Sequence, residues 1–188
     1  MDLYVAHGGS AFSQYSNELN DVIYLNDGKG NFEKEQDAIQ FSKRINTGGV
    51  DIADYDGDGL QDIFIANRNS HLSYGTVGSG YLFHNDGGNK FTEVDTKVFE
   101  DLGMVTSVAW IDADQDGDSD LLVAGEFMEI KLFVNQEGSF ITSSEDFGLA
   151  HTSGIWNTIL VHDFNQDGKE DFFVGNAGLN TSLTTDHF

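Results

Sequence analysis

The chain has 188 residues, of which 39% are hydrophobic and 12% aromatic, and this is enough apolar material for a folded core. Nine lysines and arginines face 32 aspartates and glutamates, so the formal net charge is −23. Such an acidic surface repels phosphate backbones, which argues against nucleic-acid partners, and no apolar stretch reaches the ~20 residues of a membrane span. Cysteine is absent, which excludes disulfides, thiolate zinc sites and cysteine nucleophiles.

Two landmarks recur along the chain in the same order. An aspartate followed by three large apolar residues and a small one occurs four times, at 2–6, 62–66, 120–124 and 171–175. Between these copies lie turns that contain asparagine and glycine, at 24–28, 82–87 and 132–138. Two landmarks at one period predict internal repeats, with approximate bounds 2–61, 62–119, 120–170 and a partial copy at 171–188. A small β-sandwich with coincidental repeats is the alternative.

The local pattern predicts an all-β fold, because short apolar runs are bounded by Asn, Asp and Gly clusters. The second repeat predicts four strands, at roughly 62–66, 80–84, 90–94 and 104–111. Four strands per repeat favour a β-propeller of about three four-stranded antiparallel blades. Since a closed propeller typically has about four to eight blades, we expect a segment of a larger propeller, or copies that associate through exposed blade faces.

Three acidic loops of the form D-x-[DN]-x-D-G-x-x-D stand at 54–62, 112–120 and 163–171. Clustered carboxylates repel one another, so each loop implies a compensating cation. Ligands that are all oxygen select a hard ion, and calcium accepts about six to eight oxygens in flexible geometry. We therefore expect about three calcium ions, with magnesium as the second choice.

The candidate ligands are the side chains at loop positions 1, 3 and 5, the backbone carbonyl at position 7 and the carboxylate at position 9. In the first loop they are Asp54, Asp56, Asp58, Leu60 and Asp62. In the second they are Asp112, Asp114, Asp116, Asp118 and Asp120. In the third they are Asp163, Asn165, Asp167, Lys169 and Asp171. Asn165 lacks a charge, so the third site is expected to be the weakest. His84 and His162 have no metal-ligand partner at helical or paired spacing, so no histidine is expected in these sites.

The order of acidic loop, D-φ-φ-φ-A strand and Y-L-x-N-x-G turn resembles FG-GAP/VCBS repeats, which build the β-propeller of integrin α subunits and of many bacterial surface proteins. The resemblance covers essentially the whole chain. It implies calcium at the loop positions named above, and an extracellular, cell-surface or periplasmic location. We expect the ions to be structural and to fix the turn between the last strand of one blade and the first of the next.

The expected function is that of a non-enzymatic binding or adhesion module for a protein or glycan at a cell surface. Long polar connections on a rigid scaffold often carry such contacts, and the candidates in residues 67–79 are Arg68, His71 and Tyr74. The alternative is the propeller portion of a carbohydrate-active enzyme such as a polysaccharide lyase. Against it, the chain has no G-x-S-x-G, H-E-x-x-H or P-loop motif.

Overall fold

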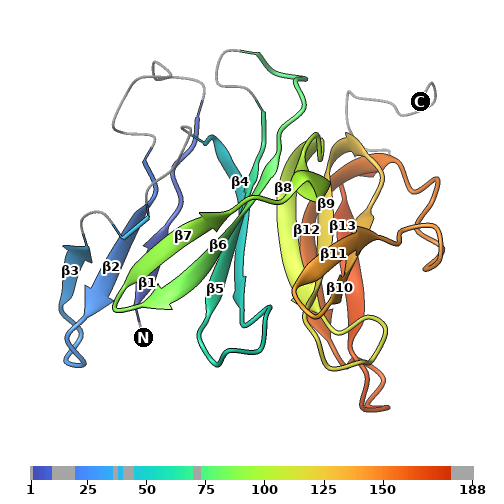
Figure 1. The fold of residues 1–188 in the computed structure, drawn as a ribbon. Coiled ribbons are helices and arrows are strands. Elements are labelled where there is room, and N and C mark those ends of the chain that lie inside the picture. Colours follow the sequence, from blue (N-terminus) through green and yellow to red (C-terminus); the bar gives the residue numbers. More distant parts are fainter. Residues whose placement is uncertain (1, 10–19, 36–37, 40–44, 70–72, 179–188) are drawn as a thin grey trace.

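The structure is a computed structural model that describes residues 2–9, 20–35, 38–39, 45–69 and 73–178. Strands make up nearly all of its regular structure (Figure 1). The elements are β1 (Leu3–Val5), β2 (Val22–Asn26), β3 (Phe32–Glu35), β4 (Thr47–Ala53), β5 (Asp62–Asn67), β6 (Gly80–Gly87), β7 (Lys90–Val94), the 3-10 turn η2 (Lys97–Phe99), β8 (Met104–Ile111), β9 (Asp120–Met128), β10 (Lys131–Gln136), β11 (Ser139–Thr142), β12 (Gly154–His162) and β13 (Asp171–Asn176). Within those residues, no helix has the length and apolar character needed to cross a membrane.

The strands form three antiparallel sheets. The first has the order β1-β2-β3 and the second the order β4-β5-β6-β7. In the third, β9 pairs with β8 along most of its length and with β12 only through Met128 and Glu126 at its end. The strands β8–β11 therefore repeat the layout of β4–β7, and β12 and β13 begin the layout again. This arrangement confirms the all-β, antiparallel prediction.

The acidic loops join strands that are hydrogen-bonded neighbours. They connect β4 to β5, β8 to β9 and β12 to β13. The expectation that each loop joins the last strand of one blade to the first of the next was therefore wrong. A short loop holds the ends of its two strands close together, which favours direct antiparallel pairing. The strand at 104–111, predicted as the fourth of its repeat, is β8 and begins the following sheet.

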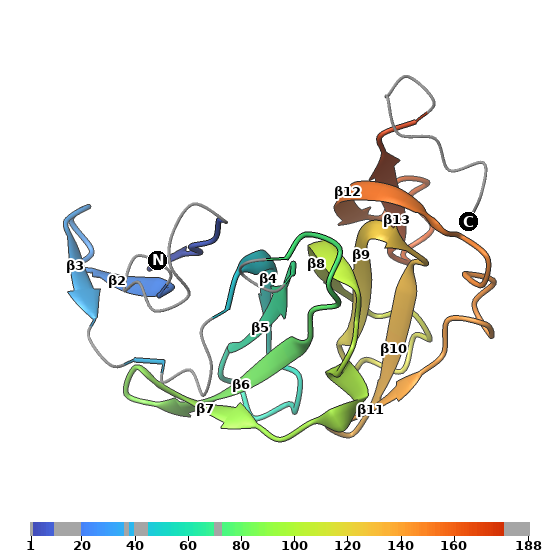
Figure 2. The same cartoon turned by 90° about the horizontal axis from the view of Figure 1, so that it is seen from above.

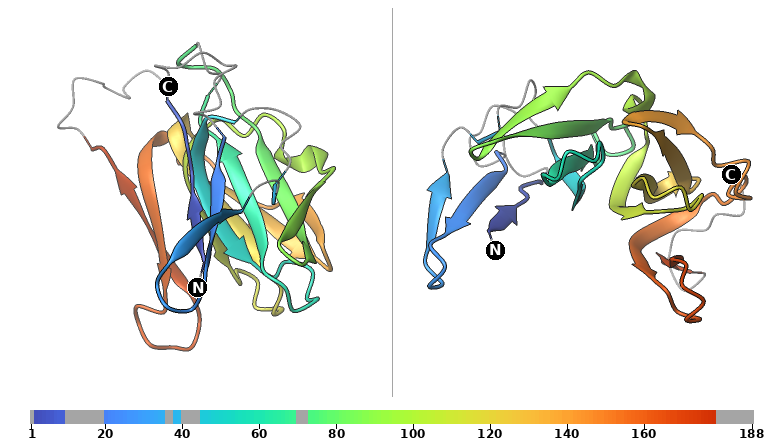
Figure 3. Two further views of the ribbon diagram at one scale, coloured as in Figure 1. Left: turned by 90° about the vertical axis from the view of Figure 1, so that its left-hand side faces the viewer. Right: turned by 60° about the horizontal axis from the view of Figure 1, so that its bottom comes forward.

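The sheets lie side by side along an open arc (Figures 2 and 3), with β1–β3 at one end and β12–β13 at the other. The first strands of successive sheets contact one another. The Trp110 N–H on β8 donates to Asp51 on β4 over 3.0 Å, and the Ile159 N–H on β12 donates to Ser107 on β8 over 3.0 Å. The arc is therefore held together at β4, β8 and β12.

Apolar side chains fill the space between adjacent sheets. Phe99 of η2 is fully buried, and its ring centroid lies 4.9 Å from that of Phe64 and 5.1 Å from those of Phe133 and Phe140. Rings at this spacing and tilt contribute more than their buried area alone. A second cluster between β9–β10 and β12–β13 is built around Leu122. Adjacent sheets thus bury the apolar side chains that they direct toward each other.

All three acidic loops lie at one end of the sheets. In Figure 1 they are the teal, yellow-green and red-orange turns at the lower edge. The connection after β5, which carries Arg68, leaves from the opposite end. In the described part of the chain, the fold therefore separates the acidic loops from the connection that follows β5.

Candidate metal centres

Each acidic loop bends twice through the left-handed region of φ. Position 6 has φ of 91° at Gly59, 95° at Gly117 and 86° at Gly168, which confirms the predicted glycine bend. Position 4 also has positive φ, at 64° for Gln115 and 62° for Gln166. The sequence did not reveal this second bend, because a side-chain-bearing residue occupies it in two loops.

Backbone N–H groups hold the loop carboxylates in the same orientation in all three loops. The N–H of position 5 donates to the side chain of position 3, and the N–H of position 7 donates to that of position 5, over 2.8–3.3 Å. In the first and third loops the glycine at position 6 also donates to the aspartate at position 1, over 2.9 Å. These bonds are local, so each loop orders its own oxygens.

The loop oxygens converge in the first two loops. Ligand atoms of three side chains lie within 4.8 Å of one another, in the sets Asp54, Asp56 and Asp58, and Asp112, Asp114 and Asp120. One oxygen of Asp54 and one of Asp112, both Oδ1 at position 1, are buried without a hydrogen-bond partner. A buried carboxylate oxygen without a donor is costly, and a cation would satisfy it. The donor set is all oxygen and fits a hard divalent ion.

The third loop differs from the other two. Among the described residues, it brings no three carboxylate or imidazole ligand atoms that close together. Position 3 is Asn165, whose amide oxygen accepts the Asp167 N–H over 2.8 Å as the aspartates do in the other loops. The bends are therefore preserved in the third loop while one charge is lost.

In the first two loops the aspartate at position 9 is buried and braces the loop. In the first loop, Asp62 Oδ1 accepts the Asn85 N–H over 2.7 Å and Oδ2 accepts the Tyr55 N–H over 3.2 Å. Asp120 makes the same pair of bonds with Asn135 and Ala113, each over 2.8 Å. Both aspartates are fully buried. In these two loops, position 9 therefore closes the loop and ties it to the hairpin of its sheet, besides being a candidate ligand.

Burial raises the pKa of both braces above the ordinary aspartate value. The backbone N–H donors oppose this rise, while the neighbouring carboxylate raises the pKa further, from Asp56 at Asp62 and from Asp114 at Asp120. The repulsion that the sequence implied is thus present at both loops. A bound cation would reverse it, because an opposite charge favours the ionised carboxylate.

His84, which was not expected to be a metal ligand from its spacing in the sequence, lies against the first loop. His84 Nδ1 is 3.2 Å from Asp56 Oδ2 and 3.4 Å from Asp62 Oδ1. The register of β5 and β6 pairs Ile63 with Phe83, which brings the next residue, His84, beside the start of β5. The expectation that no histidine joins these sites was wrong for His84, because the contact depends on strand pairing. The sequence does offer one signal for this contact. The residue directly before the hairpin asparagine is His84 in one sheet but Val134 in the next.

The predicted partner contacts lie at the other end of the sheets. Arg68 and Tyr74 both contact the buried Glu126 of β9: an Arg68 Nη2 donates to Oε1, and the Tyr74 hydroxyl donates to Oε2 over 2.8 Å. The structure therefore brings Arg68 and Tyr74 together and links them to the following sheet. His71, the third candidate, lies outside the described residues.

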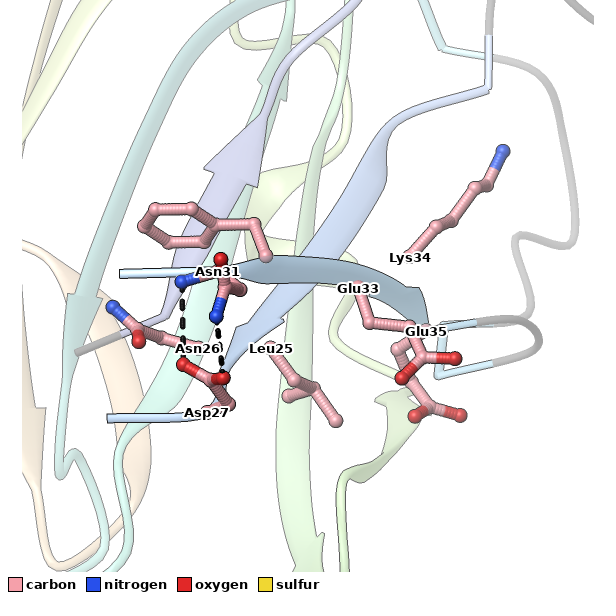
Figure 4. Close-up of a pocket in the computed structure, with 8 residues that line it drawn as sticks. Leu25, Asn26, Asp27, Asn31, Glu33, Lys34 and Glu35 are labelled. Atoms are coloured by element: carbon pink, nitrogen blue, oxygen red, sulfur yellow. Dashed lines mark hydrogen bonds between the residues drawn. The ribbon is translucent and has the colours of Figure 1, made fainter. Parts of the chain in front are cut away.

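A concave surface lies along the hairpin of β2 and β3 (Figure 4). Asp27 Oδ2 accepts the Asn31 side chain over 2.7 Å, and this bond is the main cause that lowers the Asp27 pKa. Three carboxylates, those of Asp27, Glu33 and Glu35, and one lysine, Lys34, are among the residues that line it, so the surface is acidic. The turn expected at 24–28 leads into the hairpin of β2 and β3, whose carboxylates lie apart from the three loops.

Comparison with known proteins agrees with this architecture. The model of the FG-GAP-like repeat family matches the chain three times, at residues 1–65, 54–123 and 112–174. The overlaps between matches, 54–65 and 112–123, contain the first two acidic loops, so the family's period is that of the loops. No curated protein matches the chain significantly. Because the three matches span almost the entire sequence, the chain belongs to the FG-GAP-like repeat family.

Proposed function

We propose that this chain is a calcium-binding, propeller-type repeat module that presents its loops to a protein or glycan outside the cell. In this proposal the sheets are consecutive blades, and the ions are held by the acidic loops. The candidate ligands are Asp54, Asp56, Asp58 and Asp62 in the first loop, Asp112, Asp114, Asp116 and Asp120 in the second, and Asp163, Asn165, Asp167 and Asp171 in the third, with the carbonyls of Leu60, Asp118 and Lys169.

One observation carries the proposal. The position-1 aspartates Asp54 and Asp112 have the same oxygen buried and without a donor, in two loops 58 residues apart. A repeated cost of this kind is explained by a ligand that both loops share. The oxygen donors that both loops share and the open bends favour calcium over magnesium, which demands a tighter octahedron.

The proposed role of the ion is structural. The loop groups are held by local hydrogen bonds, and Asp62 and Asp120 tie the loops to the hairpins of their sheets. An ion in such a loop would bring together two strands and the adjacent hairpin. We assign partner binding rather than catalysis to the module. At the end that carries Arg68 and Tyr74, both side chains already contact Glu126.

The test is thermal unfolding of metal-stripped protein, titrated with calcium and separately with magnesium. At a hundredfold excess over Kd, each occupied site stabilises by about 2.7 kcal/mol. For a chain of this size that is roughly a 5–10 °C rise in the midpoint per site. We expect a calcium-selective rise, reduced by about one site's share in Asp54→Asn and again in Asp112→Asn.

The asparagine variants suit the geometry of position 1. In Asp54→Asn the amide oxygen can still accept the Gly59 N–H, while the other oxygen is replaced by a nitrogen that cannot bind the ion. Asp95→Asn is the matched control, because it removes one exposed charge outside the loops. A midpoint that does not respond to calcium, or an equal response in all variants, would contradict the proposal.

A further inference from the structure

A histidine nitrogen lies against the first acidic loop, and among the described residues the second loop has no such neighbour. His84 lies on β6 directly before Asn85, and its Nδ1 faces Asp56 and Asp62 over 3.2 and 3.4 Å. In the following sheet, the residue directly before Asn135 is Val134, and the carboxylates of the second loop converge without a histidine. The two loops therefore share their oxygen donors but differ in this one group.

The His84 nitrogen is buried and has no hydrogen-bond partner. The oxygens that face it belong to carboxylates, which only accept hydrogen bonds when ionised. When Nδ1 carries no proton, three groups that offer lone pairs therefore meet at one point. Either a proton on the ring or a cation between the groups would relieve the repulsion.

The spacing of the three groups fits shared coordination. Zinc binds imidazole and carboxylate at about 2.0–2.2 Å, so two ligands on a tetrahedral ion lie about 3.3–3.6 Å apart. The distances of 3.2 and 3.4 Å are close to this range. Calcium would tolerate similar spacing, but it prefers oxygen, whereas imidazole suits zinc, cobalt and nickel. The nitrogen therefore favours a divalent transition ion at this corner of the loop.

The ring of His84 is also held in place. Its centroid lies 6.5 Å from that of Tyr55, at an interplanar angle of 89°. Asp62 is fixed in turn by the N–H groups of Asn85 and Tyr55. Two of the three ligands are thus oriented before any ion binds, which reduces the cost of ordering them.

We propose that the first loop, unlike the second, can exchange its calcium for a divalent transition ion such as zinc, which His84, Asp56 and Asp62 would hold, whereas the second loop accepts hard ions through oxygen alone. The inference rests on the proposed function in one respect, the assignment of Asp56 and Asp62 as metal ligands. It adds a selectivity that the repeat pattern does not predict, because His84 lies on a different strand from the loop.

The test uses cobalt as a spectroscopic substitute for zinc, added to the metal-stripped chain in millimolar calcium. We expect wild-type protein to bind one cobalt ion with a visible absorption band that zinc displaces. His84→Val, which copies the residue at 134, is expected to weaken cobalt binding by more than about tenfold, since even outer-shell changes cost about 10–100-fold. His151→Val is the control, because His151 is exposed and 3.9 Å from a single carboxylate.

The outcomes separate this inference from the proposed function. If cobalt binds equally well to wild type, His84→Val and His84→Gln, or not at all, the mixed site does not exist, whatever calcium does in the melts. If cobalt binding needs His84 while calcium leaves the midpoint unchanged, the mixed site stands and the calcium proposal fails. His84→Gln preserves a polar side chain of similar length, and the thermal melts of both variants show whether they still fold.

Discussion

At the scale of single residues, Asn135 links three segments of backbone. Its side-chain Nδ2 donates to the Tyr55 carbonyl over 2.7 Å and to the Ser119 carbonyl over 3.1 Å, and its Oδ1 accepts the Gly138 N–H over 2.8 Å. Tyr55 belongs to the first acidic loop and Ser119 to the second. Asn135 is fully buried, so water cannot replace its hydrogen bonds to these carbonyls. One amide therefore connects the loops of two adjacent sheets.

We expect Asn135→Ala to lower the free energy of unfolding by roughly 2–4 kcal/mol. The reason is that each buried polar group left without a partner costs about 1–3 kcal/mol. Asn85→Ala is the matched comparison, because Asn85 is only half-buried and donates to Gln61 of its own sheet's loop. Urea unfolding of both variants should show the larger loss for Asn135→Ala. Equal losses would mean that the bond to Tyr55 contributes nothing.

At the scale of elements, the first strands of successive sheets share one irregularity. The pairing register shifts at Thr47/Gly49 between β4 and β5, at Val105/Ser107 between β8 and β9, and at Trp156/Thr158 between β12 and β13. These bulges lie where the first strands contact one another. A bulge bends a strand and increases its twist, and such features are typically preserved rather than accidental.

Gly48 stands at the first of these bulges and allows β4 to approach β8. A Cβ at this position would lie 2.1 Å from the Val105 carbonyl oxygen and 2.9 Å from the Arg68 Cβ. The nearest atom belongs to the backbone, so rotation of a side chain cannot relieve the overlap. A residue without a Cβ is therefore required here for the two sheets to pack as they do.

Gly48→Ala is expected to lower the free energy of unfolding by about 1–3 kcal/mol or more, the usual cost of overpacking. For a chain of this length that is roughly a 2–12 °C fall in the midpoint. The control is Gly175→Ala on β13, where the nearest atom is the end of the Thr158 side chain at 3.0 Å. Alanine is already present at the position equivalent to Gly175 in the two earlier repeats, as Ala66 in β5 and Ala124 in β9. A Gly48→Ala variant as stable as this control would argue against the close approach.

At the scale of the whole molecule, the net charge of −23 opposes compaction. Many of these charges are in the three loops, which gather at one end of the sheets (Figure 1). Self-repulsion of this kind destabilises a folded chain, and screening or bound cations reduce it. Three calcium ions would add six positive charges where the negative charge is densest.

The metal-stripped protein should therefore melt at higher temperature as monovalent salt rises from ~0.01 to ~0.15 M, because the Debye length falls from about 30 to about 8 Å. Choline chloride is the suitable salt, since its bulky cation does not enter the loops. With calcium bound, the same change in salt should raise the midpoint by less. A midpoint that is independent of salt in both states would show that repulsion does not limit stability.

The amino-acid sequence by itself determined the repeat, the β class and the acidic loops. Each of these depends on neighbours along the chain. The glycine at position 6 permits a bend that few other residues adopt, and the spacing of Asp54, Asp56 and Asp58 places three carboxylates on one short turn. The approximate strands of the second repeat were predictable for the same reason, because alternation and turn residues are local signals.

Only the tertiary structure decided how the strands combine. The period of a repeat is the same wherever its boundary is drawn, so the sequence could not tell whether β8 ends one sheet or begins the next. The contacts of His84 with Asp56, of Asn135 with Tyr55 and of Arg68 with Glu126 join residues 28, 80 and 58 positions apart. Each arises because strand register and sheet stacking bring together groups whose spacing along the chain carries no such information.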